Sequence, residues 1–309
     1  MKDQLAKLHQ TIFNSLNLNG YKARITSVSI ISKLEKEIIH SKKFLSEIFI
    51  HERLNIFHFN RNDELKYARS IIITAAPQYP ITTVFCYDGR KINTYVPPTY
   101  TYNTDTNIRK ILQDILPKDI WLSDVILPLK LLSVFSGLSK YGRNNIAYIN
   151  GMGSFFRLKA FLSNLECIKP NEYKISMLED CDNCIACLYL CPTNAISKKR
   201  FFIEAEKCLT FLNERKDDFP DWVNPSWHNS LIGCMRCQLY CPANKKFRHL
   251  RDGIIEFDEN ETKLILNFTP FNSLSNSTKQ KITHLNLQDD YDLLPRNLSV
   301  LLNNKKGYV

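Results

Sequence analysis

The sequence of 309 residues lacks an apolar run long enough to cross a membrane. Its longest apolar stretch, Val125 to Leu138, is interrupted by Lys130 and is shorter than the about 20 residues that a spanning helix needs. The opening segment, MKDQLAKLHQ, also lacks the apolar core of a secretory signal. We therefore expect a cytoplasmic protein that does not enter a membrane, with a buried helix over Val125 to Phe135.

Common nucleotide-binding and catalytic motifs are absent as well. No Gly-x-Gly-x-x-Gly follows a predicted strand, no phosphate-binding P-loop occurs, and no pair of nucleophile and base can be identified. Such motifs therefore indicate neither a substrate nor an oligomeric state for this chain.

Basic residues outnumber acidic ones, which gives a formal net charge of +10. Lys and Arg are spread along the chain, with short concentrations at Lys198 to Arg200, at KKFRHLR from Lys245 to Arg251 and in NNKK near the end. This pattern is typical of a solvated basic surface, and it also suits an anionic partner such as a nucleic acid. No arginine-rich arm or known nucleic-acid module occurs, so the charge alone does not identify a partner.

The order of predicted elements indicates an α+β protein. Residues 1–168 have the pattern of an α/β domain, because ARITSVSI and SIIITAAP predict strands and ISKLEKEIIHSKKFL predicts a helix between them. Asp88-Gly89 stands between the alternating segments ITTVFCY and RKINTYV, which predicts a hairpin. TDTNIRKILQDIL predicts a further helix, and the helix over Val125 to Phe135 is expected to end at Gly137.

Two further segments follow this domain. Residues 169–250 are rich in cysteine, and residues 251–309 are predicted to form a short helical tail. In the tail, ENETKLILN and PRNLSVLLNN predict helices, whereas the polar stretch SLSNSTKQK predicts a loop. We expect the tail to pack against another domain, and its sequence indicates no functional residue.

Clustered cysteines are the strongest signal in the sequence. A chain expected to be cytosolic keeps its thiols reduced, so we interpret these cysteines as metal ligands rather than as disulfides. Cys181, Cys184, Cys187 and Cys191 have the spacing C-x2-C-x2-C-x3-C and are followed by Pro192. This spacing is that of bacterial two-cluster ferredoxins, in which three thiolates on a tight turn bind three irons of one cubane.

A second stretch repeats the first. CIACLYLCPTN, from Cys184 to Asn194, and CMRCQLYCPAN, from Cys234 to Asn244, share the frame C-x2-C-x3-C-P-x-N. The first cysteine of the full run would fall at Leu231 in the second copy and is absent. Such an internal repeat is typical of a pseudo-twofold ferredoxin module.

Two 4Fe–4S clusters need eight thiolates, and the two runs provide seven. Cys208 lies between the runs and is the predicted eighth ligand, since Cys86 and Cys167 lie outside the repeat and are interpreted as small buried side chains. The fourth cysteine of each run is expected to serve the other cluster. The first cluster is assigned to Cys181, Cys184, Cys187 and Cys241, and the second to Cys191, Cys208, Cys234 and Cys237.

Zinc is the alternative to iron–sulfur clusters. A zinc site pairs two short C-x2-C knuckles around one tetrahedral ion. It has no use for a third cysteine three residues on and a fourth followed by proline, and here that arrangement occurs twice. The spacing therefore favours iron–sulfur clusters.

The cluster segment resembles that of a known family. CDNCIACLYLCPTNAI, EKCLTFLNE and IGCMRCQLYCPAN are together similar to the double-cluster domain of epoxyqueuosine reductases, in which a lone cysteine between the motifs supplies the eighth ligand, as Cys208 would here. GLSKYGRNNIAYINGMGSFFRL, from Gly137 to Leu158, resembles the Gly-Leu-Gly-Trp-x-Gly-Lys-Asn block of that family. The resemblance extends from Pro128 to Lys246 and is weak before Pro128.

The resemblance implies a fold and a set of cofactors. The N-terminal domain would be of the cobalamin-binding type, with the nitroreductase-like architecture of reductive dehalogenases, and a two-cluster ferredoxin-like domain would follow it. The two 4Fe–4S clusters would pass single electrons to cobalamin, whose reduced cobalt would act on the substrate.

The resemblance also implies partners. An external low-potential donor of the ferredoxin or flavodoxin type would supply electrons, and the substrate would be tRNA or a small molecule. The alternative function is that of an electron-transfer protein, which donates electrons to a partner such as a corrinoid protein and performs no chemistry on a small substrate.

Candidate residues for the cofactor lie in the glycine block. Tyr141, Arg143, Asn144 and Asn145 match positions in this block and are assigned to cofactor binding on the resemblance. The alternatives are core packing for Tyr141 and a polar turn for the other three residues.

The sequence departs from the family in three ways. The family's proton-donating aspartate falls on Ser123 when counted back from Gly137 without a gap, and Asp124 follows it. We assign Asp124 as the candidate catalytic acid, with an N-terminal cap of the following helix as the alternative. The family's Trp-x-Gly-Lys is replaced by Lys140-Tyr141-Gly142-Arg143, and the helical-repeat tail of some members is not seen. These departures indicate a divergent branch with an unassigned or different substrate.

Overall fold

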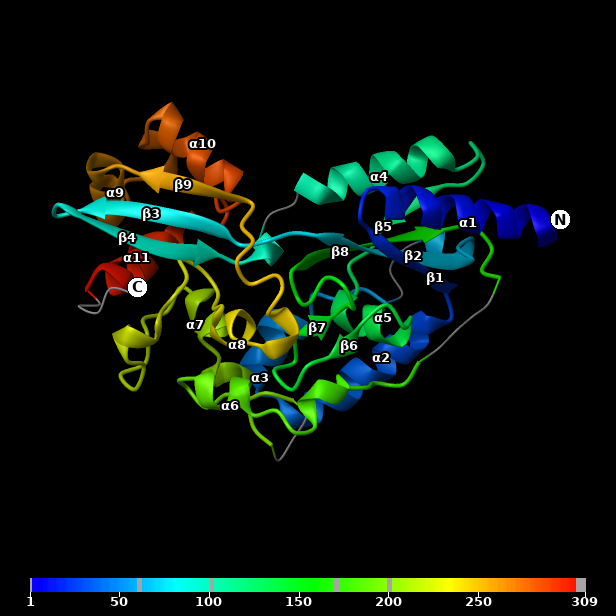
Figure 1. The fold of residues 1–309 in the computed structure, drawn as a ribbon, viewed down its shortest axis with the longest axis horizontal. Helices are drawn as coiled ribbons and strands as arrows, with labels where there is room; N and C mark the ends of the chain where they lie inside the picture. Colours follow the sequence, from blue (N-terminus) through cyan, green and yellow to red (C-terminus); the bar gives the residue numbers. More distant parts are fainter. Residues whose placement is uncertain (1, 60–62, 101–102, 169–172, 199–201, 304–309) are drawn as a thin grey trace. The chain divides into compact units, whose positions relative to one another are not determined.

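The computed structural model describes residues 2–59, 63–100, 103–168, 173–198 and 202–303 (Figure 1). Residue contacts divide the chain into two compact units, of which the first comprises Met1–Pro77 and Asn103–Cys184 and the second comprises Gln78–Tyr102 and Ile185–Val309. The mixture of helices and strands confirms the predicted α+β class. The division into 1–168, 169–250 and 251–309 stays a prediction, and its first boundary adjoins residues 169–172, which lie outside the described residues.

The first unit combines helices with an antiparallel sheet. Its helices are α1 (Lys2–Leu18), α2 (Ile30–Ser41), α3 (Glu47–Phe49), α4 (Asn103–Ile115) and α5 (Leu129–Phe135). Its strands are β1 (Lys22–Ser27), β2 (Ser70–Pro77), β5 (Leu122–Asp124), β6 (Lys140–Tyr141), β7 (Ala147–Tyr148) and β8 (Phe156–Ser163). The order in the main sheet is β1-β2-β8-β5, and β6 pairs with β7 separately.

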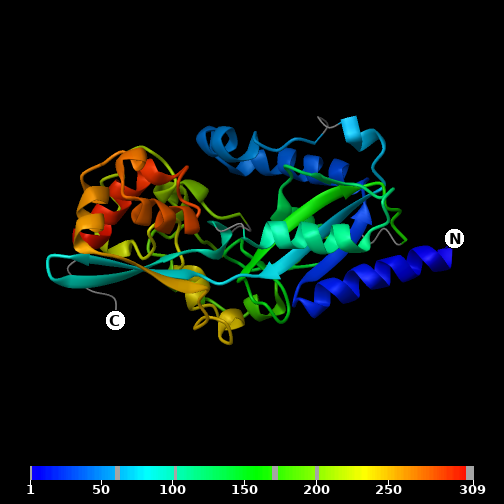
Figure 2. The same cartoon turned by 90° about the horizontal axis from the view of Figure 1, so that it is seen from above.

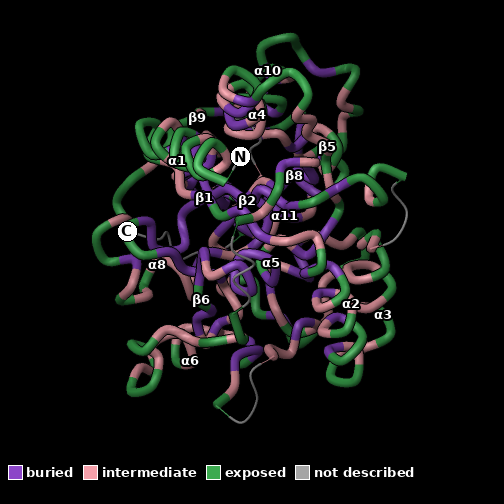
Figure 3. Tube along the Cα trace, turned by 90° about the vertical axis from the view of Figure 1, so that its right-hand side faces the viewer, coloured by how far each residue is buried: buried purple, intermediate pink, exposed green. Residues whose placement is uncertain are grey.

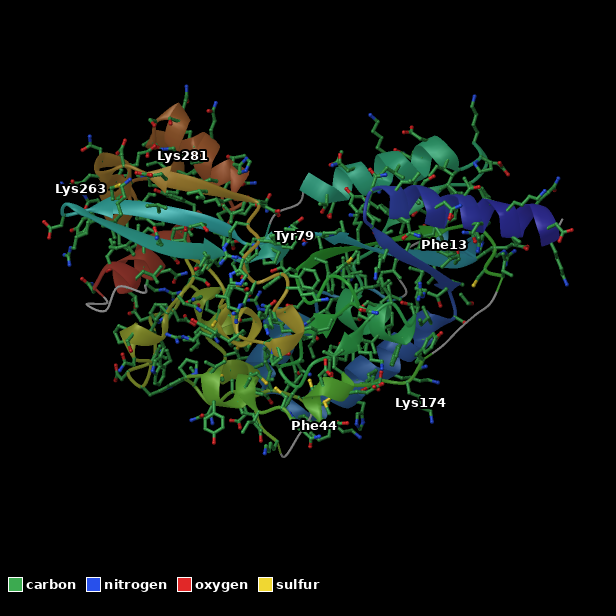
Figure 4. The ribbon with its side chains drawn as sticks, viewed as in Figure 1. Phe13, Phe44, Tyr79, Lys174, Lys263 and Lys281 are labelled. Atoms are coloured by element: carbon green, nitrogen blue, oxygen red, sulfur yellow. The ribbon has the colours of Figure 1, made fainter. Side chains whose placement is uncertain are left out.

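Helices cover both faces of the four-stranded sheet, with α1 and α4 on one side and α2 and α5 on the other (Figures 1 and 2). This explains why SIIITAAP is a continuous and mostly apolar run, because β2 is buried on both faces (Figure 3). Ile72 of β2 and Phe161 of β8 face the core beneath α1 and α4. Phe13 of α1 packs against the same core (Figure 4).

The second unit contains the cysteine-rich segment and the tail. Its helices are α6 (Ala186–Leu190), α7 (Leu209–Asn213), α8 (Arg236–Leu239), α9 (Glu259–Leu266), α10 (Asn276–His284) and α11 (Leu294–Asn303). Its strands are β3 (Ile81–Tyr87), β4 (Arg90–Val96) and β9 (Gly253–Phe257), which form a sheet in the order β4-β3-β9.

The predicted hairpin is present as β3 and β4. Asp88 and Gly89 at its tip have φ angles of 52° and 68°, as a tight two-residue hairpin turn requires. Strand β9 of the tail pairs in parallel with β3, and the stacked rings of Phe85 and Phe257 lie 4.8 Å apart. The tail therefore completes the sheet that the hairpin begins.

The helix predicted over Val125 to Phe135 is wrong in its first four residues. Residues 122–124 pair with β8 as strand β5, and α5 begins only at Leu129. Pro128 precedes it, and a proline keeps the residue before it out of the helical region. The predicted end is confirmed, because Gly137 follows the last turn with a φ of 72°.

The predicted loop SLSNSTKQK is wrong, because most of it forms α10. The hydroxyl of Ser275 accepts a hydrogen bond from the backbone N–H of Thr278 and caps the helix. The helix buries Thr278 and Ile282, and Lys281 pairs with Glu261 of α9 at 2.5 Å (Figure 4). A polar sequence can form this helix because only a few of its side chains have to reach the core.

Candidate iron–sulfur centre

All ten cysteines are free thiols of intermediate exposure. Among the residues that the structure describes, no three His, Cys, Asp or Glu side chains converge as the ligands of a single metal ion do. The helices described likewise include none long and apolar enough to span a membrane.

Cys208 and Cys234, of the set assigned to the second cluster, interact electrostatically with each other and with Cys191 within the second unit. Burial, together with the nearby thiols of Cys208 and Cys191, raises the pKa of the Cys234 thiol to about 12. Burial also raises the pKa of Cys208, and Cys191 again contributes. The raised pKa values of Cys208 and Cys234 favour the protonated thiol until a metal binds, because a metal ligand must be the thiolate. The donor set therefore fits an iron–sulfur cluster.

Backbone amides point at two of these sulfur atoms. The N–H groups of Thr210 and Phe211, in the first turn of α7, donate to the sulfur of Cys208. These hydrogen bonds partly offset the rise in its pKa that burial causes. The N–H of Arg236 at the start of α8 does the same for Cys234. The first amides of a helix have no partner within the helix, so they are available to a sulfur ligand. Hydrogen bonds of this kind stabilise thiolate and tune cluster potentials.

The sequence repeat has a structural counterpart. Cys187 lies in α6 and Cys237 lies in α8, and these two short helices pack against each other. Each copy ends with an asparagine, of which Asn244 is fully buried and donates its side-chain amide to the carbonyl of Gln238 at 2.8 Å. The two C-x2-C-x3-C-P-x-N frames thus form matching turns in one unit.

Leu231 occupies the position where the second copy lacks a cysteine. Its side chain is 1% exposed and belongs to the apolar core that β3, β9 and the tail helices form. Its backbone N–H donates to the carbonyl of Tyr95 at 2.9 Å. The position serves the core of the second unit, and this explains why the eighth thiol has to come from elsewhere.

The first assigned set divides between the two units. Cys181 and Cys184 belong to the first, whereas Cys187 and Cys241 belong to the second. Within the first unit, a guanidinium nitrogen of Arg143 donates to the carbonyl oxygen of Cys181 at 2.6 Å. The glycine block therefore holds the beginning of the cysteine run.

The other candidate cofactor residues are engaged inside the first unit. Tyr141 is 8% exposed, and burial and the nearby Glu37 raise the pKa of its hydroxyl. The side-chain amide of Asn144 donates to the Tyr148 hydroxyl at 3.0 Å, and its oxygen accepts from a backbone N–H. Asn145 has a φ of 59° and turns the chain between β6 and β7. These contacts agree with core packing for Tyr141 and a polar turn for the asparagines.

Asp124 is the last residue of β5 and does not cap α5. Its carboxylate pairs with Lys159 at 2.7 Å and with Arg109. Burial alone would raise the pKa of Asp124, but the hydrogen bonds and charges of Lys159 and Arg109 outweigh it, so the pKa lies below its ordinary value. At neutral pH Asp124 is therefore an anion and a hydrogen-bond acceptor.

Asp124 also borders a cavity of about 210 Å³ in the first unit. The wall includes His58 and is otherwise mostly apolar. Lys159 and Arg109 were missed as partners of Asp124 because they lie on other elements, and residue spacing carries no signal for such pairs.

Comparisons with known proteins agree with this site. Residues 180–244 match the family of 4Fe-4S double cluster binding domains. The epoxyqueuosine reductase of Shewanella oneidensis is 32% identical over 111 residues, which cover 36% of this chain and 27% of that protein. That of Leadbetterella byssophila is 30% identical over 158 residues, which cover 50% of this chain and 48% of the relative. This chain therefore spans at most about half the length of these relatives.

Solved structures extend the likeness beyond the cluster segment. The structure of epoxyqueuosine reductase from Streptococcus thermophilus has a TM-score of 0.67 at 19% identity, covering 98% of this chain and 81% of that one. A structure of epoxyqueuosine reductase with an epoxyqueuosine-modified tRNA-Tyr stem loop has a TM-score of 0.66 at 20% identity, covering 97% and 82%. The resemblance is confirmed: the chain is epoxyqueuosine reductase-like in its cluster segment and shares the fold of these proteins.

Proposed function

We propose that this chain is an iron–sulfur reductase of the epoxyqueuosine reductase kind, which holds two 4Fe–4S clusters and binds cobalamin. The observation that carries the proposal is the match of residues 180–244 to the 4Fe-4S double cluster binding domains, a segment that contains Cys191, Cys208 and Cys234. Two cubanes in one chain serve single-electron transfer. The chain would take electrons from an external low-potential donor of the ferredoxin or flavodoxin type.

Each part of the chain has a distinct role in this proposal. Cys181, Cys184, Cys187 and Cys241 bind the first cluster, and Cys191, Cys208, Cys234 and Cys237 bind the second. The amides of Thr210, Phe211 and Arg236 stabilise thiolate at the second cluster. Arg143 holds the backbone of Cys181 through its carbonyl.

The first unit is the proposed cobalamin-binding part. Cobalamin, when bound, supplies a low-potential cobalt that reduces the substrate. Support comes from the shared fold, which covers nearly the whole chain. The polar groups of Arg143 and Asn144 bind neighbours within their own unit. These two residues are therefore proposed to hold the backbone of this region in place rather than to contact a corrin directly. Asp124 fits an anion at neutral pH better than a proton donor.

We propose tRNA as the substrate carrier. The net charge of +10 suits a phosphate backbone, and one protein of the same fold is known with a modified tRNA stem loop. Counted without a gap, the position of the family's acid is Ser123 rather than Asp124, and the Trp-x-Gly-Lys block is changed. The reducible group is therefore proposed to differ from epoxyqueuosine, as in a divergent branch.

Anaerobic purification tests the cofactors. We expect about eight irons per chain and the electron paramagnetic resonance signals of two reduced cubanes. Added cobalamin should give a bound spectrum that changes when the clusters are reduced. Absence of binding at micromolar cobalamin would exclude the cobalamin-dependent reductase. Turnover of epoxyqueuosine-containing tRNA would instead contradict the divergent substrate.

An electron-transfer protein is the second candidate function. The observation that favours it is the ion pairing of Asp124, which leaves the assigned acid without a proton to donate at neutral pH. Such a protein would reduce a partner, for example a corrinoid protein, and would hold both clusters without binding cobalamin itself. Intact clusters together with absent cobalamin binding would support this candidate.

A further inference from the structure

The tail contributes a buried amide to the cysteine-rich segment. Asn297 of α11 is 1% exposed, and its Nδ2 donates to the carbonyl of Asn213 at 3.0 Å and to that of Leu231 at 3.1 Å. Asn213 ends α7, the helix that begins directly after Cys208. Leu231 lies three residues before Cys234. One side chain therefore joins the two segments that carry these thiols.

A second hydrogen bond closes the same link. The Nδ2 of Asn213 donates to the carbonyl of Gly233 at 2.6 Å, and Gly233 immediately precedes Cys234. The segment after Cys208 is thus tied directly to the residue before Cys234. Asn297 binds the backbone carbonyl of Asn213 at one end of this tie and that of Leu231, two residues before Gly233.

Arg296 supports the amide from the neighbouring position. Its guanidinium donates to Oδ1 of Asn297 from Nε at 3.1 Å and from Nη2 at 2.9 Å, which fixes the orientation of the amide. It also donates to the carbonyls of Leu212 at 3.1 Å and Asn213 at 3.3 Å, and it stacks over the ring of Phe219 at 4.1 Å. The contacts with Leu212, Asn213 and Phe219 lie in the segment that follows Cys208.

General core packing does not require this amide. Leu294 and Leu298 already bury the apolar face of α11 in the core of the second unit. A buried polar group is costly unless its hydrogen bonds are made, so an asparagine here needs a reason beyond burial. The partners of Asn297 across the fold lie in the segments that flank Cys208 and Cys234.

We propose that Asn297 is a positioning residue for the second 4Fe–4S cluster, which sets the separation of Cys208 from Cys234. The inference rests on the proposed two-cluster function. Asn297 touches no reacting atom, and it acts through Asn213 and the backbone before Cys234. The tail, in which the sequence indicated no functional residue, thereby takes part in the redox site.

The test compares Asn297→Asp and Asn297→Leu with the wild-type chain. Asp keeps the shape and the acceptor for Arg296 but loses the N–H donors, whereas Leu removes all polar contacts. Asn303→Leu is the matched control, because Asn303 lies on the same helix and is exposed. The readouts are iron content, the midpoint potential of each cluster and the rate of iron release to a chelator.

We expect both Asn297 variants to alter the signal and the potential of the second cluster and to leave those of the first unchanged. Release of about four irons should be at least about tenfold faster, the factor that corresponds to one buried hydrogen bond. The control should behave as wild type. Equal loss of both clusters, or no change in either variant, would overturn the inference.

Failure of the proposed function is separately visible. A wild-type chain with about four irons or none would refute the two-cluster proposal before any variant is compared. If the Leu variant does not accumulate, the Asp variant still decides, because it preserves the volume of the side chain. Recovery of wild-type release rates in that variant counts against the positioning role.

Discussion

The ammonium of Lys159 on β8 lies 2.7 Å from a carboxylate oxygen of Asp124 at the end of β5. Arg109 of α4 binds the same carboxylate. The residue that resemblance assigned as a proton donor is therefore held as an anion by two cations. This arrangement links three elements of the first unit and determines how Asp124 responds to pH.

Replacing Lys159 by Met should raise the pKa of Asp124, because burial then opposes ionisation with only Arg109 to offset it. A carboxyl group whose pKa is depressed in the folded state stabilises the fold at pH values above its ordinary pKa. This stabilisation is lost as the pH falls through the depressed pKa. Wild type and Lys159→Met should differ most near neutral pH and least once the pH lies below the depressed pKa of Asp124. The difference should stay under about 1 kcal/mol, because the carboxylate is more than half exposed.

Carbon-13 NMR of the Asp124 carboxyl group measures its pKa directly, and thermal unfolding across pH measures the stability. Lys174→Met serves as the control, because Lys174 is exposed in the same unit (Figure 4). An unchanged Asp124 pKa in Lys159→Met would show that Lys159 does not hold the anion.

Cys208→Ala should remove the second cluster and leave the first. The iron content should fall from about eight to about four per chain, with one remaining signal by electron paramagnetic resonance. Cys86→Ala is the control, since Cys86 lies on β3 and outside both runs. Retention of about eight irons in Cys208→Ala would contradict the assignment of Cys208 as the eighth ligand.

Leu231→Cys would complete the second run in sequence, but it should not add a ligand. The side chain points into an apolar core, so the variant should cost about 2 kcal/mol of stability, at the lower end of the values for truncated buried leucines. Denaturant unfolding and iron content provide the two readouts. The double variant Leu231→Cys with Cys208→Ala tests this prediction. About eight irons in that variant would mean that the new thiol replaces Cys208, and would disprove the prediction that position 231 cannot supply a ligand.

Gly233→Ala should destabilise the second unit more than Gly89→Ala. Both glycines have a φ of 68°, so the backbone strain is alike. A Cβ on Gly233 would lie 2.9 Å from the Tyr100 hydroxyl and 3.1 Å from a ring carbon of Pro97, whereas nothing lies within 4 Å of one on Gly89. We expect a cost of about 1–2 kcal/mol for the hairpin glycine and a greater one for Gly233.

Thermal unfolding of the two alanine variants measures this contrast, and the signal of the second cluster reports any shift of the adjacent Cys234. Equal midpoints would mean that Tyr100 and Pro97 move aside without cost. A shifted cluster signal in Gly89→Ala would mean that the effect is not local.

Local patterns predicted the elements that depend on local chemistry. SIIITAAP predicted β2 because burial on both faces of a sheet leaves few polar positions. Asp88-Gly89 predicted the hairpin because few residues tolerate two consecutive positive φ angles. The repeated cysteine frame predicted a two-cluster segment because thiol spacing is set by the cluster itself.

Features that depend on distant residues could not be predicted in this way. SLSNSTKQK contributes to a helix because Ile282, directly after it, enters a core that the rest of the second unit supplies, and because Thr278 donates to Glu261 of α9. The partner strand of β9 is β3, from which it is far separated in sequence. The pairing of Asp124 with Lys159 likewise depends on the register of β5 against β8. The sequence alone suggested an N-terminal cap for Asp124, because β5 and Pro128 were not recognised.

The hairpin of β3 and β4 belongs with residues that follow it by more than eighty positions. The chain passes from one unit to the other after Pro77, after Tyr102 and after Cys184. Cutting the gene at any single point would therefore give a fragment in which at least one unit is incomplete. Fragments ending near 168 or 184 would carry the hairpin without β9 and expose an unpaired strand edge, which favours aggregation. Dissection of the redox segment from the rest would require a circular permutant or a fusion that brings Gln78–Tyr102 along.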